Sequence, residues 1–378
     1  MNEGKGRGCE TPRERLFKAL AGEPTERVPV WLLFPYHPTS YYVNVLAHAE
    51  YRRVFEFGCA QGVITLDRRN LRAPLHTPEV ATLVHDEDGL RRRILQWGNL
   101  RVVSESKPRG GGKKLLTTDE DLETFCALPV DDDPKRIAAA MEAQWPSYLR
   151  ERAEFPAELG AMMLDLGSPV NVLYHESELD AFAIWSVTHA ATIERWLEHA
   201  MVRIEIIYRW CLERDLADVY FLVGSELAAP PLVSRETFRR WVLPYESRLI
   251  RLIHSYGKKV IQHFHGHIRG LLPDFGEMAP DGLHTIEAPP TGDCPLSEAY
   301  VATNERITLI GNVQYDEFRS LAPEMMRLRV QRLLEEVGRR RFILSPTAGP
   351  FDPSPPPRLI ENYLAFIAAA VEFRRENS

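Results

Sequence analysis

The run VIQHFHGH places two histidines, His263 and His265, two residues apart near the end of an apolar stretch. Alternate side chains of a strand share a face, so we expect both imidazoles to point the same way. Glu287 ends a later apolar run, GLHTIEA, and its carboxylate would supply a third ligand. Two histidines and one carboxylate leave zinc an open position, as in catalytic sites. The pattern therefore predicts a metal site at these three residues, and the alternative is a hydrogen-bonded polar cluster without metal.

A second set of candidates could act as acids or bases. Glu226 follows Gly224 and Ser225 at the end of the apolar run VYFLVG. Its carboxylate suits an acid or base, a substrate anchor or a helix cap. Tyr174 and His175 lie about one helical turn beyond the loop LGSPVN, where they either face the site or pack. We expect the catalytic residues to be Glu226, Tyr174 and His175.

A third set could hold the substrate. Asp165 precedes the loop LGSPVN, and Ser168 lies within it, just before a helical pattern. Backbone N–H groups at a helix N-terminus favour an anion, and an ordinary helix cap is the alternative use of this loop. Asn312 stands near the end of the run ITLIGNV. We expect Asp165, Ser168 and Asn312 to contact the substrate.

The elements that must position these residues are eight short apolar runs separated by helical patterns. Near-continuous apolar runs are typical of parallel strands that are buried on both faces. Their repeated alternation with helices favours a single (β/α)8 TIM barrel over a doubly wound sheet, with function at the carboxyl ends of the strands. The expected strands are 28–34, 62–66, 161–166, 219–224, 258–264, 282–288, 307–313 and 341–346.

Three further features complete the expected architecture. An N-terminal helix begins at TPRERLFKALAGE, where Thr11 and Glu14 form a capping box and Gly22 is a stop. The segment after the second strand contains LRRRILQWGNLRVVSE, which predicts an antiparallel hairpin in an insertion over part of the barrel mouth. Pro244 should kink the helical pattern around it. We expect residues 1–10 to be disordered and 11–378 to form one domain.

Composition narrows the class of protein. The net charge of −7 argues against a nucleic-acid partner, and the chain has no apolar run long enough for a membrane span. Its 5 cysteines are scattered and form no Cys-x-x-Cys pair, which argues against a disulfide framework and against a cysteine zinc site. The N-terminus has no signal-peptide core. These features predict a cytoplasmic protein that acts on a small molecule.

Several of these motifs together resemble a known family. TPRERLFKALAGEPTERVPV resembles the opening of the uroporphyrinogen decarboxylase superfamily, and HFHGHIRGLLPDF is similar to its His-x-Cys-Gly segment with the helix that follows. DGLHTIEAPPTGD, ITLIGNV and FILSPTAGPFDPSPPP continue the likeness in the same order. The resemblance runs from about Thr11 to the final helix, and it implies a β/α barrel and an enzyme.

The superfamily has a decarboxylase branch and a methyltransferase branch. The decarboxylases clamp a tetrapyrrole with arginines after the first strand, whereas this chain has WLLFPYHPTSYY there. The tyrosine of the decarboxylases falls at His175, or at Tyr174 if the register slips by one, and their late histidine is absent from SPTAGPFDP. Without an arginine clamp, the binding of a polycarboxylate would be poorly compensated. The resemblance is therefore closer to the other branch.

That branch consists of corrinoid-linked methyltransferases, which hold zinc through His-x-Cys, a later cysteine and a nearby acidic residue. His263 matches the family histidine, His265 stands at the first cysteine, Glu287 at the acidic residue and Ala348 at the second cysteine. Both thiolates are thus missing. A metal held with less anionic charge would be a stronger Lewis acid, suited to polarising a substrate oxygen.

The resemblance thus predicts removal of a methyl group from an ether and its transfer to a corrinoid protein. One alternative is a decarboxylase-like lyase that works without metal. The other is a non-catalytic barrel that binds a ligand or a corrinoid protein, since fold does not fix function.

Overall fold

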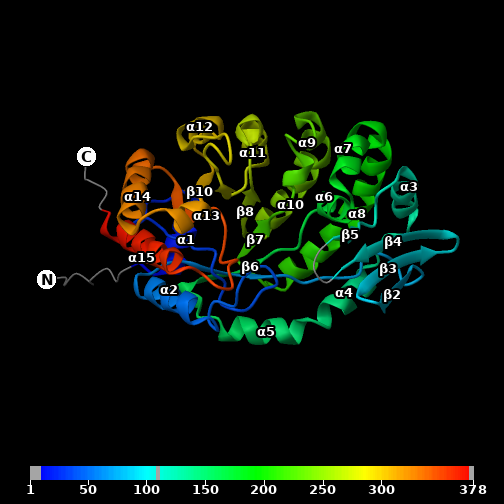
Figure 1. Cartoon of the computed structure of the whole chain (residues 1–378), viewed down its shortest axis with the longest axis horizontal. Helices are drawn as coiled ribbons and strands as arrows, with labels where there is room; N and C mark the ends of the chain where they lie inside the picture. Colours follow the sequence, from blue (N-terminus) through cyan, green and yellow to red (C-terminus); the bar gives the residue numbers. More distant parts are fainter. Residues whose placement is uncertain (1–9, 108–110, 374–378) are drawn as a thin grey trace.

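A curled sheet of seven parallel strands forms the centre of the molecule in a computed structural model that describes residues 10–107 and 111–373. Each strand pairs with its neighbour in the order of the sheet, as in a TIM-like barrel (Figure 1). The strands are β1 (Thr65–Arg69), β6 (Gly160–Leu164), β7 (Val219–Leu222), β8 (Lys259–Phe264), β9 (Gly282–Thr285), β10 (Thr308–Val313) and β11 (Phe342–Pro346).

The segment predicted as the first strand lies between the two edges of this sheet. The backbone N–H of Trp31 donates to the carbonyl oxygen of Leu344 in β11, at 2.9 Å. On the other side, the N–H of Ile64, which directly precedes β1, donates to the carbonyl of Val30 at 2.7 Å. The segment forms only these isolated bridges and no full ladder. It nevertheless links the edge strands β11 and β1.

Helices follow the strands along the chain and lie around the sheet (Figure 1). The four-turn and longer helices α8, α14 and α15 bury one face each against the core. The helices are α1 (Pro12–Ala21), α2 (Ala49–Ala60), α3 (Asp119–Ala127), α4 (Pro134–Glu142), α5 (Trp145–Glu154), α6 (Pro169–Glu176), α7 (Leu179–Thr188), α8 (Ala190–Glu213), α9 (Arg235–Trp241), α10 (Leu243–Ser255), α11 (Leu272–Met278), α12 (Leu296–Ala302), α13 (Tyr315–Ser320), α14 (Pro323–Val337) and α15 (Pro357–Glu372). Short 3₁₀ turns are η1 (Ala157–Leu159), η2 (Glu226–Ala228) and η3 (Arg269–Leu271).

Helix α1 begins and ends as the sequence predicts. The Thr11 side chain accepts from the N–H of Glu14, the Glu14 carboxylate accepts from the N–H of Thr11, and Gly22 ends the helix with φ 75°. Residues 1–9 of the segment expected to be disordered lie outside the described residues. Glu10 is described and does not fit that expectation, because it is buried and pairs with Lys18 at 2.7 Å.

Helix α1 also packs against the amino ends of the strands. Its Ala19 carbonyl accepts a hydrogen bond from the side chain of Thr308, at the start of β10. The Arg13 guanidinium donates to the carbonyl of Gly160, at the start of β6. Leu16 and Leu20 join the apolar cluster inside the sheet. The helix thus covers the end of the sheet opposite to the carboxyl ends, which leaves those ends for the site.

A second, antiparallel sheet occupies the chain between β1 and β6. It consists of β2 (Ala81–Glu87), β3 (Leu90–Trp97), β4 (Leu100–Ser106) and β5 (Gly112–Lys113), and β3 and β4 form the hairpin that the sequence predicts. It lies at one end of the molecule, beside α3 and α4 (Figure 1). An ion pair between Arg93 and Glu176 links it to α6. That this insertion covers part of the barrel mouth remains a prediction.

Pro244 interrupts a helical pattern, as its missing N–H requires. The helix α9 ends at Trp241, and α10 starts at Leu243 with Pro244 in its first turn, so the expected kink is a break between two helices. Within the described ranges, no helix combines the length and the apolar character that crossing a bilayer demands.

Candidate functional site

The carboxyl ends of the neighbouring strands β7 and β8 bring three potential metal ligands together. Glu226 begins the turn η2 that follows β7, His263 lies in β8, and His265 comes just after that strand. One donor atom from each residue lies within 4.8 Å of the others, and no cysteine belongs to such a group anywhere in the described part of the chain. Nε2 of His263 is 3.9 Å from Oε1 of Glu226. These three residues are called the ligand group below.

His263 is buried and its second ring nitrogen is already engaged. Its Nδ1 lies 2.7 Å from Nδ1 of His284, and Nε2 of His284 lies 3.0 Å from the carbonyl oxygen of Pro346. Burial holds the pKa of His263 well below its usual range and lowers the pKa of His284 to about 3. These shifts favour the neutral imidazole, which is the form in which histidine binds a metal.

His265 is held from behind by Glu287. Its Nδ1 lies 3.3 Å from Oε1 of Glu287, and the other oxygen of that carboxylate accepts from the N–H of Gly266 at 2.8 Å. Burial opposes a charge on His265, but the hydrogen bond and the charge of Glu287 together raise its pKa. The buried carboxylate thus fixes one ring nitrogen of His265 and leaves Nε2 for the ligand group.

The carboxylate of the ligand group is therefore not the one that the sequence suggested. Glu287 was expected as the third ligand, and Glu226 as an acid, base or substrate anchor. In the structure Glu226 stands with the two histidines, whereas Glu287 is paired behind His265. The positions of these two residues differ from the expectation because the strand end of β9 places Glu287 against Gly266 and Nδ1 of His265, away from the ligand group.

The donor set fits a single zinc ion. Two ligand atoms that each lie about 2.0–2.2 Å from one tetrahedral ion are roughly 3.3–3.6 Å apart. The 3.9 Å between Nε2 of His263 and Oε1 of Glu226 exceeds this by a few tenths of an ångström, and the donor atoms of the three residues lie within 4.8 Å of one another, so the side chains would have to move closer together around an ion. Burial raises the pKa of Glu226, although its own backbone N–H and the charge of His265 oppose the rise. A cation between the three side chains would compensate this partly buried carboxylate.

A second buried glutamate lies beneath the loop that carries Glu226. Glu246, in α10, accepts hydrogen bonds from the hydroxyl of Ser225 and from the amide of Gln262. Burial raises its pKa to about 7, although these hydrogen bonds oppose the rise. The Ser168 hydroxyl lies 3.2 Å from that of Ser225, which places this predicted substrate contact one residue from Glu226. Glu246 escaped sequence reasoning because it lies within a helix, where a glutamate usually faces solvent.

Tyr174 and His175 are neighbours in sequence but lie in different surroundings. Tyr174 is buried, and a Cβ added to Gly224 would lie only 2.7 Å from its hydroxyl oxygen, so it borders the loop before Glu226. Burial and the charge of Glu226 raise the pKa of Tyr174. His175 is exposed, and its carbonyl accepts from Lys114 of the insertion at 2.8 Å. The structure brings Tyr174, but not His175, to the ligand group.

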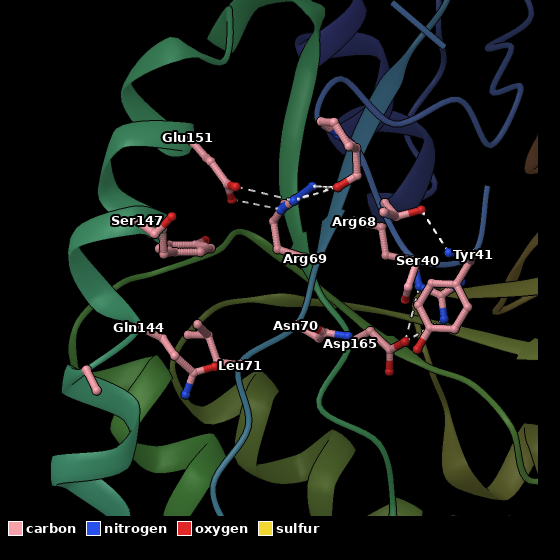
Figure 2. Close-up of a pocket in the computed structure, with 14 residues that line it drawn as sticks. Ser40, Tyr41, Arg68, Arg69, Asn70, Leu71, Gln144, Ser147, Glu151 and Asp165 are labelled. Atoms are coloured by element: carbon pink, nitrogen blue, oxygen red, sulfur yellow. Dashed lines mark hydrogen bonds and ion pairs between the residues drawn. The ribbon is translucent and has the colours of Figure 1, made fainter. Parts of the chain in front are cut away.

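Asp165 lines a cavity of about 520 Å³ beside the ligand group, and the arginines Arg68 and Arg69 line it too (Figure 2). The Arg68 guanidinium donates to Asp165 through Nε at 3.1 Å and Nη2 at 2.5 Å. It also stacks over the rings of Tyr41, at 4.2 Å, and Phe221, at 5.0 Å. Phe221 in turn lies 5.3 Å from the ring of His263. We call this hollow the Arg68 cavity.

The Arg68 cavity lies beside the ligand group without including it. Among the described residues that line it, none belongs to the ligand group, and Phe221 stands between Arg68 and His263. Polar side chains such as Asn70, Gln144 and Ser147 form much of its wall (Figure 2). Sequence reasoning missed Arg68, although its position at the end of the second predicted strand was the available signal.

Asn312 is occupied by other parts of the protein. Its side-chain amide donates to the carbonyl of Ile286 at 3.1 Å, and its oxygen accepts from Arg329 at 3.4 Å. Both polar groups of the Asn312 side chain therefore bond to other parts of the protein. The bond from its amide holds the backbone of Ile286, the residue before Glu287. The expected contact with a substrate remains a prediction that this arrangement does not favour.

The fold and the strand-end residues define an α/β protein of the TIM-like type with a histidine–glutamate group at the carboxyl ends of its strands. Residues 165–373, more than half of the chain, match the family model described as uroporphyrinogen decarboxylase (URO-D). The chain belongs to this family, which confirms the resemblance seen in its motifs.

Solved structures of other proteins resemble this one, among them a methyltransferase and a methionine synthase. A methyltransferase from Methanosarcina mazei is 18% identical with a TM-score of 0.57, and the likeness covers 96% of this chain and 98% of that one. It shows a shared fold. A B12-independent methionine synthase from Shewanella sp. W3-18-1 is 12% identical with a TM-score of 0.44, over 92% and 97% of the two chains, which is too loose to support an inference. The sequence matches none of the curated proteins with which it was compared.

Proposed function

We propose that this protein is a methyltransferase that removes a methyl group from an oxygen of a small substrate and passes it to a corrinoid protein. The observation that carries the proposal is the convergence of Glu226, His263 and His265, with Nδ1 of each imidazole already engaged by a buried partner. A polar cluster that merely fills space would not leave two imidazole nitrogens and a carboxylate facing one another. The family and the shared fold with a methyltransferase agree with this proposal.

In the proposed mechanism the ligand group would hold zinc through His263, His265 and the carboxylate of Glu226. When bound, the ion supplies Lewis acidity toward the ether oxygen of the substrate, and this is strong because no thiolate reduces its charge. Glu287 and His284 keep the two imidazoles in place from behind. Glu226 contributes the single negative charge of the set.

The residues around the ligand group would bind and orient the substrate. We propose that the polar part of the substrate lies in the Arg68 cavity, where Arg68 and Asp165 offer hydrogen-bond donors and acceptors. Phe221 separates these groups from His263 and would shield the reacting bond from water. The Tyr174 hydroxyl beside Gly224 would donate to the substrate from the side of Glu226. The high pKa of Tyr174 keeps that proton in place.

The experiment is a methyl-transfer assay with zinc-loaded protein, reduced cobalamin and a panel of small aryl and alkyl methyl ethers. We expect the absorbance change of corrinoid methylation with at least one ether, together with release of the corresponding alcohol. Glu226→Ala and His263→Ala should abolish it, whereas the matched histidine variant His175→Ala should not, because His175 lies away from the ligand group. Corrinoid methylation that survives His263→Ala would contradict the proposal.

Membership of the URO-D family favours decarboxylation as the second candidate. Its substrate carries many carboxylates, and the cavity offers Arg68 and Arg69 in place of a clamp. Arg69 already pairs with Glu151 at 3.0 Å. Arg68 is already neutralised by Asp165, so a polycarboxylate would gain little from it. Release of carbon dioxide from uroporphyrinogen without added metal would establish this alternative. Binding of a corrinoid protein without turnover of any substrate would establish the non-catalytic one.

A further inference from the structure

We propose that His284 is a positioning residue that fixes the proton of His263 on Nδ1 and so points the lone pair of Nε2 at the ligand group. The proposal deepens the proposed function, because its value for catalysis rests on a metal bound there. The observation that carries it is a chain of contacts from Pro346 through His284 to His263 inside the sheet. Sequence reasoning gave His284 no role.

The Pro346 carbonyl, at the end of this series of contacts, determines the direction of both hydrogen bonds. The carbonyl oxygen of Pro346 can only accept, so Nε2 of His284, 3.0 Å away, must carry a hydrogen. His284 is fully buried and is neutral, because an isolated imidazolium without a paired carboxylate is costly there. A neutral imidazole with its hydrogen on Nε2 has a lone pair on Nδ1. The 2.7 Å contact to His263 is therefore a hydrogen bond that His263 donates.

This hydrogen bond determines the state of Nε2, the other ring nitrogen of His263. With its hydrogen on Nδ1, the neutral ring has a free lone pair on Nε2, which is the atom 3.9 Å from Glu226. In the opposite tautomer an N–H would point at the ligand group and would exclude a cation. The partner of one ring nitrogen thus decides whether the other can bind a metal.

Aromatic packing holds the rings of His263 and His284 in the orientation that this hydrogen bond requires. The His284 ring lies 5.4 Å from Trp31, and the His263 ring lies 5.3 Å from Phe221, measured between ring centroids. Trp31, Phe221 and both histidines are buried. A 180° flip of the His284 ring would place Cδ2 against Nδ1 of His263 and Cε1 against the Pro346 carbonyl, so both hydrogen bonds would be lost.

The first test needs no metal, and it uses a variant only to assign signals. In metal-free protein labelled with 15N-histidine, two-bond 1H–15N spectra report the tautomer of each imidazole, and His263→Gln assigns the signals of His263. We expect His263 to be protonated on Nδ1 and His284 on Nε2 at neutral pH. A His263 ring that carries its hydrogen on Nε2 would overturn the proposal.

The second test measures zinc affinity by competition with a chromophoric chelator. His284→Leu removes the acceptor and should lower the affinity about 10–100-fold, the range found for such outer partners. His284→Gln keeps an acceptor oxygen and an amide donor and should retain affinity within about threefold. His76→Leu is the matched control, because His76 also faces a proline carbonyl, that of Pro129 at 3.3 Å, in another part of the chain.

The outcomes separate this proposal from the proposed function. His263 protonated on Nδ1 in a chain that binds no zinc would uphold the positioning role and contradict the metal-dependent function. Equal affinity losses in folded His284→Gln and His284→Leu would overturn the positioning role, even if methyl transfer occurs. Should His284→Leu fail to fold, the tautomer in the wild-type chain and the affinity of His284→Gln still decide the matter.

Discussion

Oε1 of Glu287 lies 3.3 Å from Nδ1 of His265, on the side of that ring away from the ligand group. This contact makes Glu287 an outer partner and leaves Glu226 as the carboxylate that faces the two histidines. Zinc-binding histidines commonly have such a carboxylate behind them, so the contact supports the proposed metal site. The first two predictions follow from it.

Glu226→Ala should weaken zinc binding more than Glu287→Ala does. The first change removes a ligand and should lower the affinity by more than about 100-fold, whereas loss of an outer partner typically costs about 10–100-fold. Chelator competition at neutral pH measures both. The reverse order, with Glu226→Ala close to wild type, would restore Glu287 as the ligand and contradict the geometry.

Gly292→Ala should loosen Glu287 without touching any proposed ligand. A Cβ at Gly292 would lie 2.2 Å from the carbonyl oxygen of Glu287 and 2.7 Å from its Cβ, so the backbone there must move. We expect zinc affinity to fall about tenfold as His265 loses its partner. Gly270→Ala is the control, because nothing lies within 4 Å of the added atom. Equal affinities in the two variants would argue against a role for Glu287.

Arg68 and Asp165 should depend on each other for stability. Both side chains are largely buried, with 11% and 8% of their surface exposed. Arg68→Met leaves a buried carboxylate uncompensated and should cost about 3–5 kcal/mol of unfolding free energy. The double variant Arg68→Met/Asp165→Asn should regain a large part of that loss. Urea unfolding of the two single variants and the double variant measures the coupling. Additive losses would show that the pair does not interact.

Glu246 should make the protein less stable at alkaline pH. Its folded pKa of about 7 lies above the ordinary 4.5, so the folded chain binds more protons than the unfolded chain between these values. The contribution to stability is complete below pH 4.5 and is lost as the pH rises through 7, by at most about 1.4 kcal/mol per pH unit. Unfolding free energies at pH 5.5 and pH 8 should converge in Glu246→Gln.

Glu246→Gln suits this test because the protein offers a hydrogen-bond acceptor for the new amide group. Oε1 of Gln262 has no partner, and a flip of that amide would offer it to the new NH2 group. The Ser225 hydroxyl can still donate to the remaining oxygen. The same decline with pH in Glu246→Gln as in the wild type would show that another group is responsible.

The elements of the fold could be predicted from sequence because buried parallel strands and capped helices have local signatures. The apolar runs at 219–224 and 307–313 contain β7 and β10, and the Thr11 capping box defines α1. The run at 28–34 is predicted as a strand on the same grounds, but it pairs only through isolated bridges to the neighbouring edges, which its own sequence does not determine.

The ligand group could be predicted only in part. The two-residue spacing of His263 and His265 is local, and it correctly places both imidazoles together. The choice between Glu226 and Glu287 depends on the loop after β7, where Gly224 adopts φ 92° and lets the chain pass close to Tyr174. No spacing in the sequence encodes that path.

His284 is a second residue whose contacts could not be predicted from the sequence. It sits in the middle of the apolar run GLHTIEA, where a lone histidine reads as a core residue that has found a partner. Its contacts to His263 and Pro346 join residues 21 and 62 positions apart along the chain. Such contacts become visible only when β8, β9 and β11 are placed in one curled sheet.

X-ray absorption at the zinc edge of the loaded protein tests the central claim most directly. We predict one zinc per chain with nitrogen and oxygen neighbours at about 2.0–2.1 Å, no sulfur shell at about 2.3 Å, and loss of the metal in His263→Ala. A sulfur shell, or a spectrum that His263→Ala leaves unchanged, would contradict the assignment of the ligand group.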